Sequence, residues 1–303
     1  MSGTTRVGRF RSDDARARFH AAYDAALAAW PAQPTERDVA TTFGTTRVHV
    51  CGAAGAAPIV LLHAITVASP SWYASIGALS ERHPVYAVDA ITDAGRSVQD
   101  VAIGDAGDMA RWLDEVLAGL ELTSVHLVGL SYGGWIALNQ TCRSPRRLAS
   151  VTVVDPPGAL GRARGTMLAG MAWNGMLAKF AKSDEAIHRM LRTLNNGSLL
   201  PQPLLDLCIT GLRGFRGHAP LPRRVKDRDL HEICTPMLLI LGAHSPVNAP
   251  DRVVERAHRL IPGVQTDVVP DAGHTIPMEQ PARFTDRVLR FVDGVDARLV
   301  DPS

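Results

Sequence analysis

A serine in a glycine-rich turn is the clearest candidate in this sequence for a catalytic residue. Ser131 lies in the motif GLSYGG at residues 129–134, directly after an apolar, β-rich run and before a helical pattern. A serine on such a sharp strand-to-helix turn adopts strained backbone angles, and side chains two residues before or after it would collide. The turn would expose the Ser131 hydroxyl as a nucleophile and direct the Tyr132 amide, at the helix N-terminus, toward a developing oxyanion.

The general base that such a serine needs is expected to be His274. It follows the last strand-like run, residues 266–270, so it falls on a loop at the same edge of the predicted sheet as Ser131. Of the eleven histidines, His274 alone has this placement. Three others lie in or beside strand-like runs and are expected to be core or supporting groups: His63, His126 and His244.

The elements that must position these residues follow an alternating pattern. Short apolar runs alternate with longer helical patterns, which is typical of βαβ units and a mostly parallel sheet. The predicted strands are residues 58–63, 85–89, 125–129, 151–155, 237–242 and 266–270, preceded by an antiparallel edge strand over 41–51 with a turn at Gly44. The clearest predicted helices are residues 12–30, 105–120, 132–143, 251–260 and 282–295.

One long segment, residues 158–233, interrupts this pattern. It has no clear strand, many Met and Leu residues and a basic stretch with prolines at 220–228. A helical insertion above the sheet fits this composition better than a structureless loop does. We therefore predict a core formed by residues 1–157, with an N-terminal helix, and 234–303, and a helical cap of 158–233. The cap would cover the carboxyl edge of the strands, where open α/β sheets bind ligands.

Several further segments match one known family. Besides GLSYGG, they are Leu61-Leu62-His63 with Trp72-Tyr73 downstream, residues 85–89 with Gly95 and Ser97, the sequence GHTIPMEQP at 273–281, and an N-terminal helix over 23–30. Together they resemble the α/β-hydrolase superfamily, in particular bacterial carboxylesterases of the naproxen-esterase type. The resemblance covers nearly the whole chain and is weakest in 158–233. It implies the α/β-hydrolase fold, a mostly parallel central sheet flanked by helices with a helical cap insertion, and a serine hydrolase of small carboxylic esters.

The resemblance also implies an oxyanion hole and an acyl pocket. The amides of Tyr132 and Ile65 would be the oxyanion donors. The family usually has His-Gly before the second donor, whereas this chain has His63-Ala64, which requires a negative φ at the alanine. The β-branched Ile65 would narrow the pocket beside the oxyanion. The other implied pocket residues are Ala64 and four residues of the predicted cap, Met167, Met171, Trp173 and Met176. The four cap residues are equally well explained as ordinary helix packing.

The acid that would orient His274 is absent from its expected position. In the family the loop after the strand at 237–241 carries Asp or Glu, but residues 242–246 read GAHSP here, with Ser245 in the acid position. A hydroxyl can accept the imidazole N–H but brings no negative charge to an imidazolium, and neutralising the acid of a serine protease lowers turnover by about 10⁴.

The alternative acid is Asp155, at the end of the predicted strand 151–155. It follows Ser131 by one strand-helix-strand unit, which would bring it to the same sheet edge. The sequence leaves open whether Asp155 or Ser245 orients His274, and whether Asp155 instead caps its own turn through an Asx-type bond. A distance within about 3.2 Å from the imidazole to Asp155 would favour the relocated acid.

Composition limits the class of partner. The chain has 303 residues, 46% of them hydrophobic, and 32 basic against 30 acidic residues. This balance argues against duplex nucleic acid as a partner. The four cysteines are scattered, so neither a disulfide framework nor a zinc site is suggested. No run reaches the roughly 18 apolar residues that span a bilayer. We expect a cytoplasmic protein with a small-molecule ester or natural-product substrate and with no metal, cofactor, nucleic acid or membrane partner; a homodimer stays open.

Three functions remain open at this stage. The leading hypothesis is a hydrolase of a small, largely apolar carboxylic ester or lactone, acting through an acyl-enzyme on Ser131. The second keeps the fold and uses Ser131 and His274 for proton transfer in a lyase, cyclase or lactonising enzyme of natural-product metabolism. The third is a non-catalytic small-molecule binding protein that kept the pocket.

Overall fold

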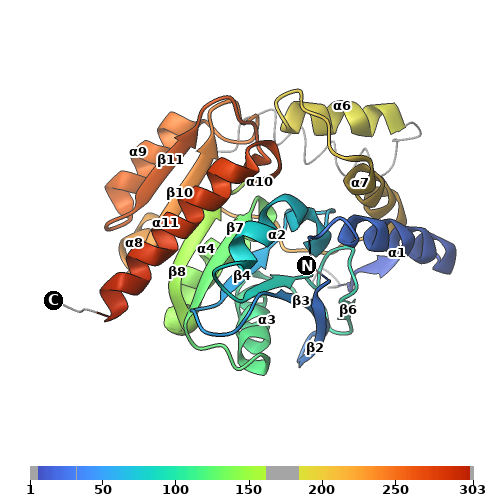
Figure 1. Cartoon of the computed structure of the whole chain (residues 1–303), viewed down its shortest axis with the longest axis horizontal. Coiled ribbons are helices and arrows are strands. Elements are labelled where there is room, and N and C mark those ends of the chain that lie inside the picture. Colours follow the sequence, from blue (N-terminus) through green and yellow to red (C-terminus); the bar gives the residue numbers. More distant parts are fainter. Residues whose placement is uncertain (1–5, 32, 162–183, 301–303) are drawn as a thin grey trace, which may run out of the picture.

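A computed structural model of the 303-residue chain describes residues 6–31, 33–161 and 184–300. In this part a large twisted sheet carries helices on both faces (Figure 1), and β1 and β9 form a separate two-stranded ribbon. The strand order in the large sheet is β11-β10-β8-β7-β4-β5-β3-β2, with β6 paired to β3. The strands from β11 to β5 are parallel, whereas β3 runs antiparallel to β5, β2 and β6.

The strands have short, mostly buried sequences. They are β1 (Arg9–Phe10), β2 (Thr35–Thr41), β3 (Gly44–Cys51), β4 (Ile59–Leu62), β5 (Val85–Val88), β6 (Val98–Gln99), β7 (Val125–Leu130), β8 (Leu148–Val154), β9 (Phe215–Arg216), β10 (Met237–Gly242) and β11 (Gln265–Val269).

The described helices are amphipathic segments between these strands. They are α1 (Asp13–Leu27), α2 (Tyr73–Ser80), α3 (Ala106–Gly119), α4 (Tyr132–Arg143), α6 (Asp184–Leu194), α7 (Gln202–Gly214), α8 (Asp227–His231), α9 (Pro250–Leu260), α10 (Ile276–Glu279) and α11 (Pro281–Val300), with short 3₁₀ turns at Ser69–Trp72 and Pro145–Arg147.

The predicted fold class, a mostly parallel sheet flanked by helices, is confirmed. The segment 41–51 differs in detail, because the predicted edge strand is a hairpin of β2 and β3 in which β2 is the edge. Gly44 begins β3 at a φ of 131°, and a Cβ there would lie 2.2 Å from the Val98 carbonyl oxygen, so the close approach of β6 requires glycine.

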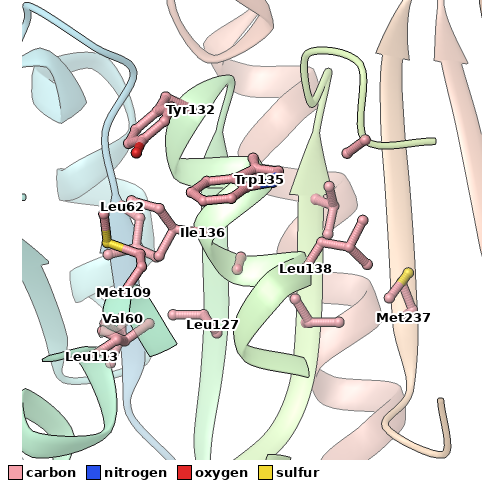
Figure 2. Packing of buried hydrophobic residues seen from close by; sticks show 14 of the residues in the cluster. Val60, Leu62, Met109, Leu113, Leu127, Tyr132, Trp135, Ile136, Leu138 and Met237 are labelled. Atoms are coloured by element: carbon pink, nitrogen blue, oxygen red, sulfur yellow. The ribbon is translucent and has the colours of Figure 1, made fainter. Parts of the chain in front are cut away.

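Alternation along the strands divides the core between the two faces of the sheet. On β4, Val60 and Leu62 pack against α3 and α4, and Ile59 and Leu61 pack on the opposite side, toward α2 and α11. Figure 2 shows the first face, where Leu62 and Met109 lie close to Ile136 of α4. The sheet is therefore buried on both faces, as expected for parallel strands joined by helical crossovers.

Helices from the predicted cap segment pack against the N-terminal helix. Phe19 and Tyr23 of α1 share a buried cluster with Leu204 and Leu207 of α7, and the two helices lie side by side in Figure 1. The segment 158–233 contributes α6, α7, β9 and α8 to the described structure. The division into a core and a cap at residues 157 and 234 stays a prediction.

Candidate active site

Ser131 stands between β7 and α4 in a strained conformation. Its φ is 55° and its ψ is −116°, outside the regions that non-glycine residues prefer. The strain is fixed by close packing, because a Cβ on Gly129 would lie 2.2 Å from the Gly133 carbonyl oxygen, and one on Gly133 would lie 2.2 Å from that of Leu62. The Ser131 amide donates to the Val154 carbonyl at 2.8 Å, which ties the turn to the neighbouring strand β8.

The structure brings His274 between Ser131 and Asp155. The Nε2 atom of His274 lies 2.8 Å from the Ser131 hydroxyl oxygen, and its Nδ1 atom lies 2.5 Å from Asp155 Oδ2. The second distance is within the limit that the sequence argument set for a relocated acid. The two ends meet because β7 and β8 are neighbours, with Leu130 opposite Val154. All three side chains are buried.

Asp155 has other hydrogen-bond partners besides the His274 imidazole. Its Oδ2 atom accepts from the Ser245 hydroxyl at 2.5 Å, and its Oδ1 atom accepts from the Asn248 side-chain amide at 2.9 Å. Its own φ is 42°, an uncommon left-handed value that Asp tolerates better than most residues. The carboxylate thus points at His274, Ser245 and Asn248, and these contacts orient it toward the imidazole.

Ser245 therefore contacts the acid. Its hydroxyl donates to Asp155 and accepts from the backbone amide of Val247 at 3.1 Å, at the end of the loop that follows β10. Asn248 could not be identified from the sequence, because an amide three residues beyond the expected acid position has no distinguishing pattern.

A glutamate fixes the loop that carries His274. Glu279 Oε2 accepts from the Gly273 amide at 2.7 Å, and Glu279 Oε1 accepts from the Thr275 amide at 2.9 Å. The two backbone amides that flank His274 are thus held by one carboxylate from α10. Glu279 lies in the GHTIPMEQP motif, but the motif alone gave no reason to assign it this contact.

The end of α6 also contacts the histidine loop. The His274 amide donates to the Leu194 carbonyl at 2.7 Å, and the Thr275 hydroxyl bonds the side-chain oxygen of Asn195. A Cβ on Gly273 would lie 2.4 Å from the Leu194 oxygen, so glycine is required for this approach. The backbone position of His274 therefore depends on a helix from the insertion as well as on the sheet.

His63 orients the peptide before the candidate second oxyanion donor. The Ala90 amide donates to His63 Nε2 at 2.9 Å, which leaves the proton on Nδ1 for the Ala64 carbonyl at 2.7 Å. In a trans peptide the carbonyl and the following N–H point in opposite directions, so the Ile65 N–H is turned away from His63. Ala64 has no positive φ, which satisfies the requirement for a methyl group in place of glycine.

Asp93 holds the next peptide of this loop. Its carboxylate accepts from the amides of Thr66 and, at 2.8 Å, Ala94. Burial raises the pKa of Asp93, while the neighbouring His63 and these amides oppose the rise. Thr66 has a φ of 74°, so the loop after Ile65 is strained and is fixed by this buried acid.

Tyr132 contributes its amide to the site and its side chain elsewhere. As the first residue of α4 it has no acceptor for its N–H within the helix. Its hydroxyl donates to the Pro220 carbonyl at 2.9 Å, and burial raises its pKa. The free amide is therefore available to a ligand beside Ser131, whereas the phenol is hydrogen-bonded to Pro220 and has no part in this site.

The remaining predicted pocket residues divide into two groups. Ala64 is nearly buried, whereas the Ile65 side chain is 44% exposed, the largest exposure among the apolar residues of this loop. The cap residues fall outside the described residues: Met167, Met171, Trp173 and Met176. Among the described residues, no group of three His, Cys, Asp or Glu side chains could hold a metal ion.

The other histidines make contacts away from Ser131. His126 bonds to Ser150 at 2.8 Å and to Asp296 at 3.0 Å, below the sheet, and burial lowers its pKa. His244 is exposed and lies 3.8 Å from Asp271.

In residues 6–31, 33–161 and 184–300, no helix is long and apolar enough to cross a membrane.

The fold and the serine turn define a class, and a family comparison agrees with it. Residues 59–287 match the model of the alpha/beta hydrolase family, and the chain belongs to that family. Carboxylesterase YbfK of Bacillus subtilis is 30% identical over 296 residues, which cover 94% of this chain and 97% of YbfK. Two solved structures from the same species have TM-scores of 0.85 at 29% identity. One is carboxylesterase CesB (YbfK), covering 93% of this chain and 99% of its own; the other is naproxen esterase, covering 92% and 98%.

Proposed function

We propose that this protein is a carboxylic-ester hydrolase that acts through an acyl-enzyme on Ser131. The observation that carries the proposal is the continuous hydrogen-bonded series from the Ser131 hydroxyl through His274 to Asp155, at 2.8 and 2.5 Å. A nucleophile, a base and an orienting acid in this order constitute a catalytic triad. The carboxylesterase relatives support the same reaction class.

The first half-reaction would form the acyl-enzyme. His274 Nε2 accepts the Ser131 proton as the serine oxygen attacks the ester carbonyl carbon, and the carbonyl oxygen becomes an oxyanion. The free amide of Tyr132 and the Ile65 amide, turned by His63, are the proposed donors to this oxyanion. The imidazolium then protonates the departing alcohol as the carbon–oxygen bond of the ester breaks.

The second half-reaction would release the acid. His274 accepts a proton from water as the water oxygen attacks the acyl carbon, and it returns that proton to Ser131 when the acyl–oxygen bond breaks. Asp155 keeps the Nδ1 proton in place and stabilises the imidazolium in both steps. The hydroxyl of Ser245 and the amide of Asn248 keep the carboxylate aligned with the imidazole.

The substrate class proposed is a small, largely apolar ester. The exposed side chain beside the proposed oxyanion donor is the apolar Ile65, and the net charge of the chain is only +2. One of the similar structures is a naproxen esterase. An uncharged ester needs no electrostatic steering to reach such a site.

Covalent labelling tests this proposal. A fluorophosphonate probe should label the wild-type chain at Ser131, identified by mass spectrometry of the digest, and should fail to label Ser131→Ala. A series of p-nitrophenyl esters from acetate to octanoate should be hydrolysed, with activity lost in parallel with labelling. A folded wild-type sample that neither reacts with the probe nor hydrolyses any ester would refute it.

The non-hydrolytic alternative has less support. It was suggested by the lack of a carboxylate at position 245, and the hydrogen bond from His274 to Asp155 supplies one from the neighbouring strand. Substantial turnover of a natural substrate by Ser131→Ala would favour proton transfer without a covalent step.

A further inference from the structure

A second candidate binding site lies on the ribbon formed by β1 and β9. Phe10 and Phe215 are directly opposite each other in this antiparallel pair, and their rings are 5.1 Å apart. The Phe10 ring also lies 5.3 Å from Phe19 of α1. Since side chains alternate between the two faces of a strand, this apolar face fixes the ribbon on α1 and turns the neighbouring residues outward.

The outward face of the ribbon carries arginines directly opposite one another. Arg9 is the register partner of Arg216, and both are exposed. Arg11 follows Arg9 by two residues on the same face, and its amide donates to the Gly214 carbonyl at 2.8 Å. Like charges directly opposite in an antiparallel pair destabilise it. Such an arrangement is a local conflict of the kind found at functional sites.

These arginines have no acidic partner in the described part of the chain. Ion pairs occupy the acidic residues that follow in the sequence: Asp13 pairs with Arg16 at 2.9 Å and Asp14 with Arg18 at 2.5 Å. None of the ion pairs in residues 6–31, 33–161 and 184–300 includes an arginine of the ribbon. Outside the described residues, the sequence contains a single acidic residue, Asp301, next to the C-terminus.

The ribbon arginines line a surface concavity of about 980 Å³. The opposite wall is the segment after β6, and the Gln99 side chain joins the two walls by accepting from the Gly8 amide at 2.8 Å. The charged and titratable residues in the lining are four arginines, one histidine and one carboxylate: Arg6, Arg9, Arg11, Arg216, His218 and Asp100. A volume of this size is within the range of small-molecule sites.

We propose that this concavity binds a soluble organic phosphate with two or more phosphate groups. Guanidinium groups bind phosphate oxygens in a bidentate fashion, and several neighbouring arginines match a ligand with several phosphates. A bound polyanion would also relieve the repulsion between Arg9 and Arg216. The lining includes none of Ser131, His274 and Asp155, so the proposal is independent of the proposed esterase activity.

Tripolyphosphate is a suitable probe, with binding measured by calorimetry and by the rise in Tm. A ligand that binds only the folded state raises its stability in a saturable way. Arg9→Gln and Arg216→Gln should each lower the affinity for tripolyphosphate at least tenfold. The matched control is Arg37→Gln, which removes an exposed strand arginine outside the concavity and should leave the affinity unchanged.

Three results would overturn the proposal. One is a Tm rise that sodium chloride reproduces at equal ionic strength, which would indicate general screening. Another is equal affinity in the wild type and both ribbon variants. A third is retention on vesicles containing phosphatidylglycerol with no binding of tripolyphosphate, which would assign the arginines to a lipid surface instead.

Discussion

The described residues include more than one hydrogen-bonded set of a serine, a histidine and an aspartate. One is Ser150 with His126 and the partly exposed Asp296, and two others are buried throughout. In the first buried set, which we call the triad cluster, His274 lies between Ser131 and Asp155. In the second buried set, which we call the Tyr23 cluster, the Tyr23 hydroxyl lies 2.6 Å from His49, 2.9 Å from Ser69 and 2.9 Å from Asp89. The residue types are nearly the same, so the difference lies in the arrangement.

The Tyr23 cluster is closed around its own hydrogen bonds. Asp89 accepts from the backbone amides of Ser69 at 2.9 Å and Arg96 at 2.8 Å in addition to Tyr23, so this carboxylate fastens two loops together. Ser69 is completely buried, at 0% exposure. Burial and the charge of Asp89 raise the pKa of Tyr23 well above its usual range. Tyr23, His49 and Asp89 are also completely buried, so the cluster has no exposed group.

The triad cluster differs in backbone strain and in access. Ser131 has a positive φ and is 7% exposed, and the free amide of Tyr132 follows it. Asp155 accepts hydrogen bonds from side chains of two loops, including the His274 imidazole, whereas Asp89 accepts from two backbone amides and the Tyr23 hydroxyl. Placement at the carboxyl edge of the parallel strands does not separate the two clusters, because Asp89 directly follows the parallel strand β5. The strained Ser131 and the free helix amide beside it mark the triad cluster as the candidate site.

The largest contrast should appear when each serine is removed. Ser131→Ala should lower kcat by about 10⁴ or more, because it removes the nucleophile, with little change in folding stability. Ser69→Ala should keep kcat close to wild type and lower the free energy of unfolding by about 1–3 kcal/mol, because a buried hydrogen-bond partner of Tyr23 is lost. Ester hydrolysis and urea unfolding measure the two effects. Equal losses of activity would erase the distinction.

Replacing the two acids should give the next contrast. Asp155→Asn should lower kcat by about 10⁴, since the amide cannot stabilise the imidazolium and favours the wrong tautomer. Asp89→Asn should act on stability instead, because its carboxylate fastens the loops at Ser69 and Arg96 and leaves the reacting atoms alone. Activity per folded molecule is the comparison to make. A nearly wild-type kcat in Asp155→Asn would refute the relocated acid.

Position 245 sharpens the assignment of the acid. Ser245→Ala removes a charge-assisted bond to Asp155, worth about 1.5 kcal/mol or more, so kcat should fall about tenfold. Ser245→Asp would place a second carboxylate beside Asp155, and two such groups cannot both ionise easily. Its activity should therefore fall and require a higher pH. A gain in kcat with Ser245→Asp would show instead that 245 is the working acid position.

The double variant Asp155→Asn, Ser245→Asp completes this test. If His274 can use either place, the double variant should recover part of the activity that Asp155→Asn loses. If only a carboxylate at position 155 has the correct orientation, the double variant should be no more active than Asp155→Asn. The pH profile of kcat/KM shows whether a recovered activity again depends on an ionised carboxylate and a neutral histidine, as a restored triad requires.

The sequence predicted the elements and the local turn better than it predicted the contacts between loops. The placement of Ser131 between two glycines follows from local steric rules. In the structure a Cβ at either glycine would collide with the backbone, as the sequence predicted. The fold class followed from the alternation of apolar runs and helices. Local pattern suffices where the physical constraint is itself local.

The acid could be narrowed only to Asp155 or Ser245, because the choice depends on which strand lies next to β7. The contacts of Asn248, Asn195 and Glu279 join residues from separate segments and leave no periodic signal in the sequence. The ribbon of β1 and β9 was also missed, since two-residue strands are too short to show alternation. The missed features all depend on tertiary neighbours.

The smallest expected effect is the pH dependence of stability that comes from His49, the histidine of the Tyr23 cluster. Tyr23 donates to Asp89, so His49 Nε2 carries the proton that it shares with Tyr23. His49 Nδ1 is buried and has no hydrogen-bond partner among the described residues. Protonation of Nδ1 would bury a charged N–H with no acceptor, and burial accordingly lowers the pKa of His49 below 6.5.

The sign of the effect on stability follows from proton uptake. Below pH 6.5 the unfolded chain binds a proton at His49 that the folded chain does not bind, so the free energy of unfolding falls as the pH falls toward the lowered folded-state value. His49→Gln should flatten the stability profile between pH 7 and about 5, measured by urea unfolding at each pH. His244→Gln, at an exposed position, should leave the slope unchanged. An unaltered slope in His49→Gln would mean that the Tyr23 cluster accepts the proton without cost, and the contrast between its closed arrangement and the open triad cluster would lose its electrostatic basis.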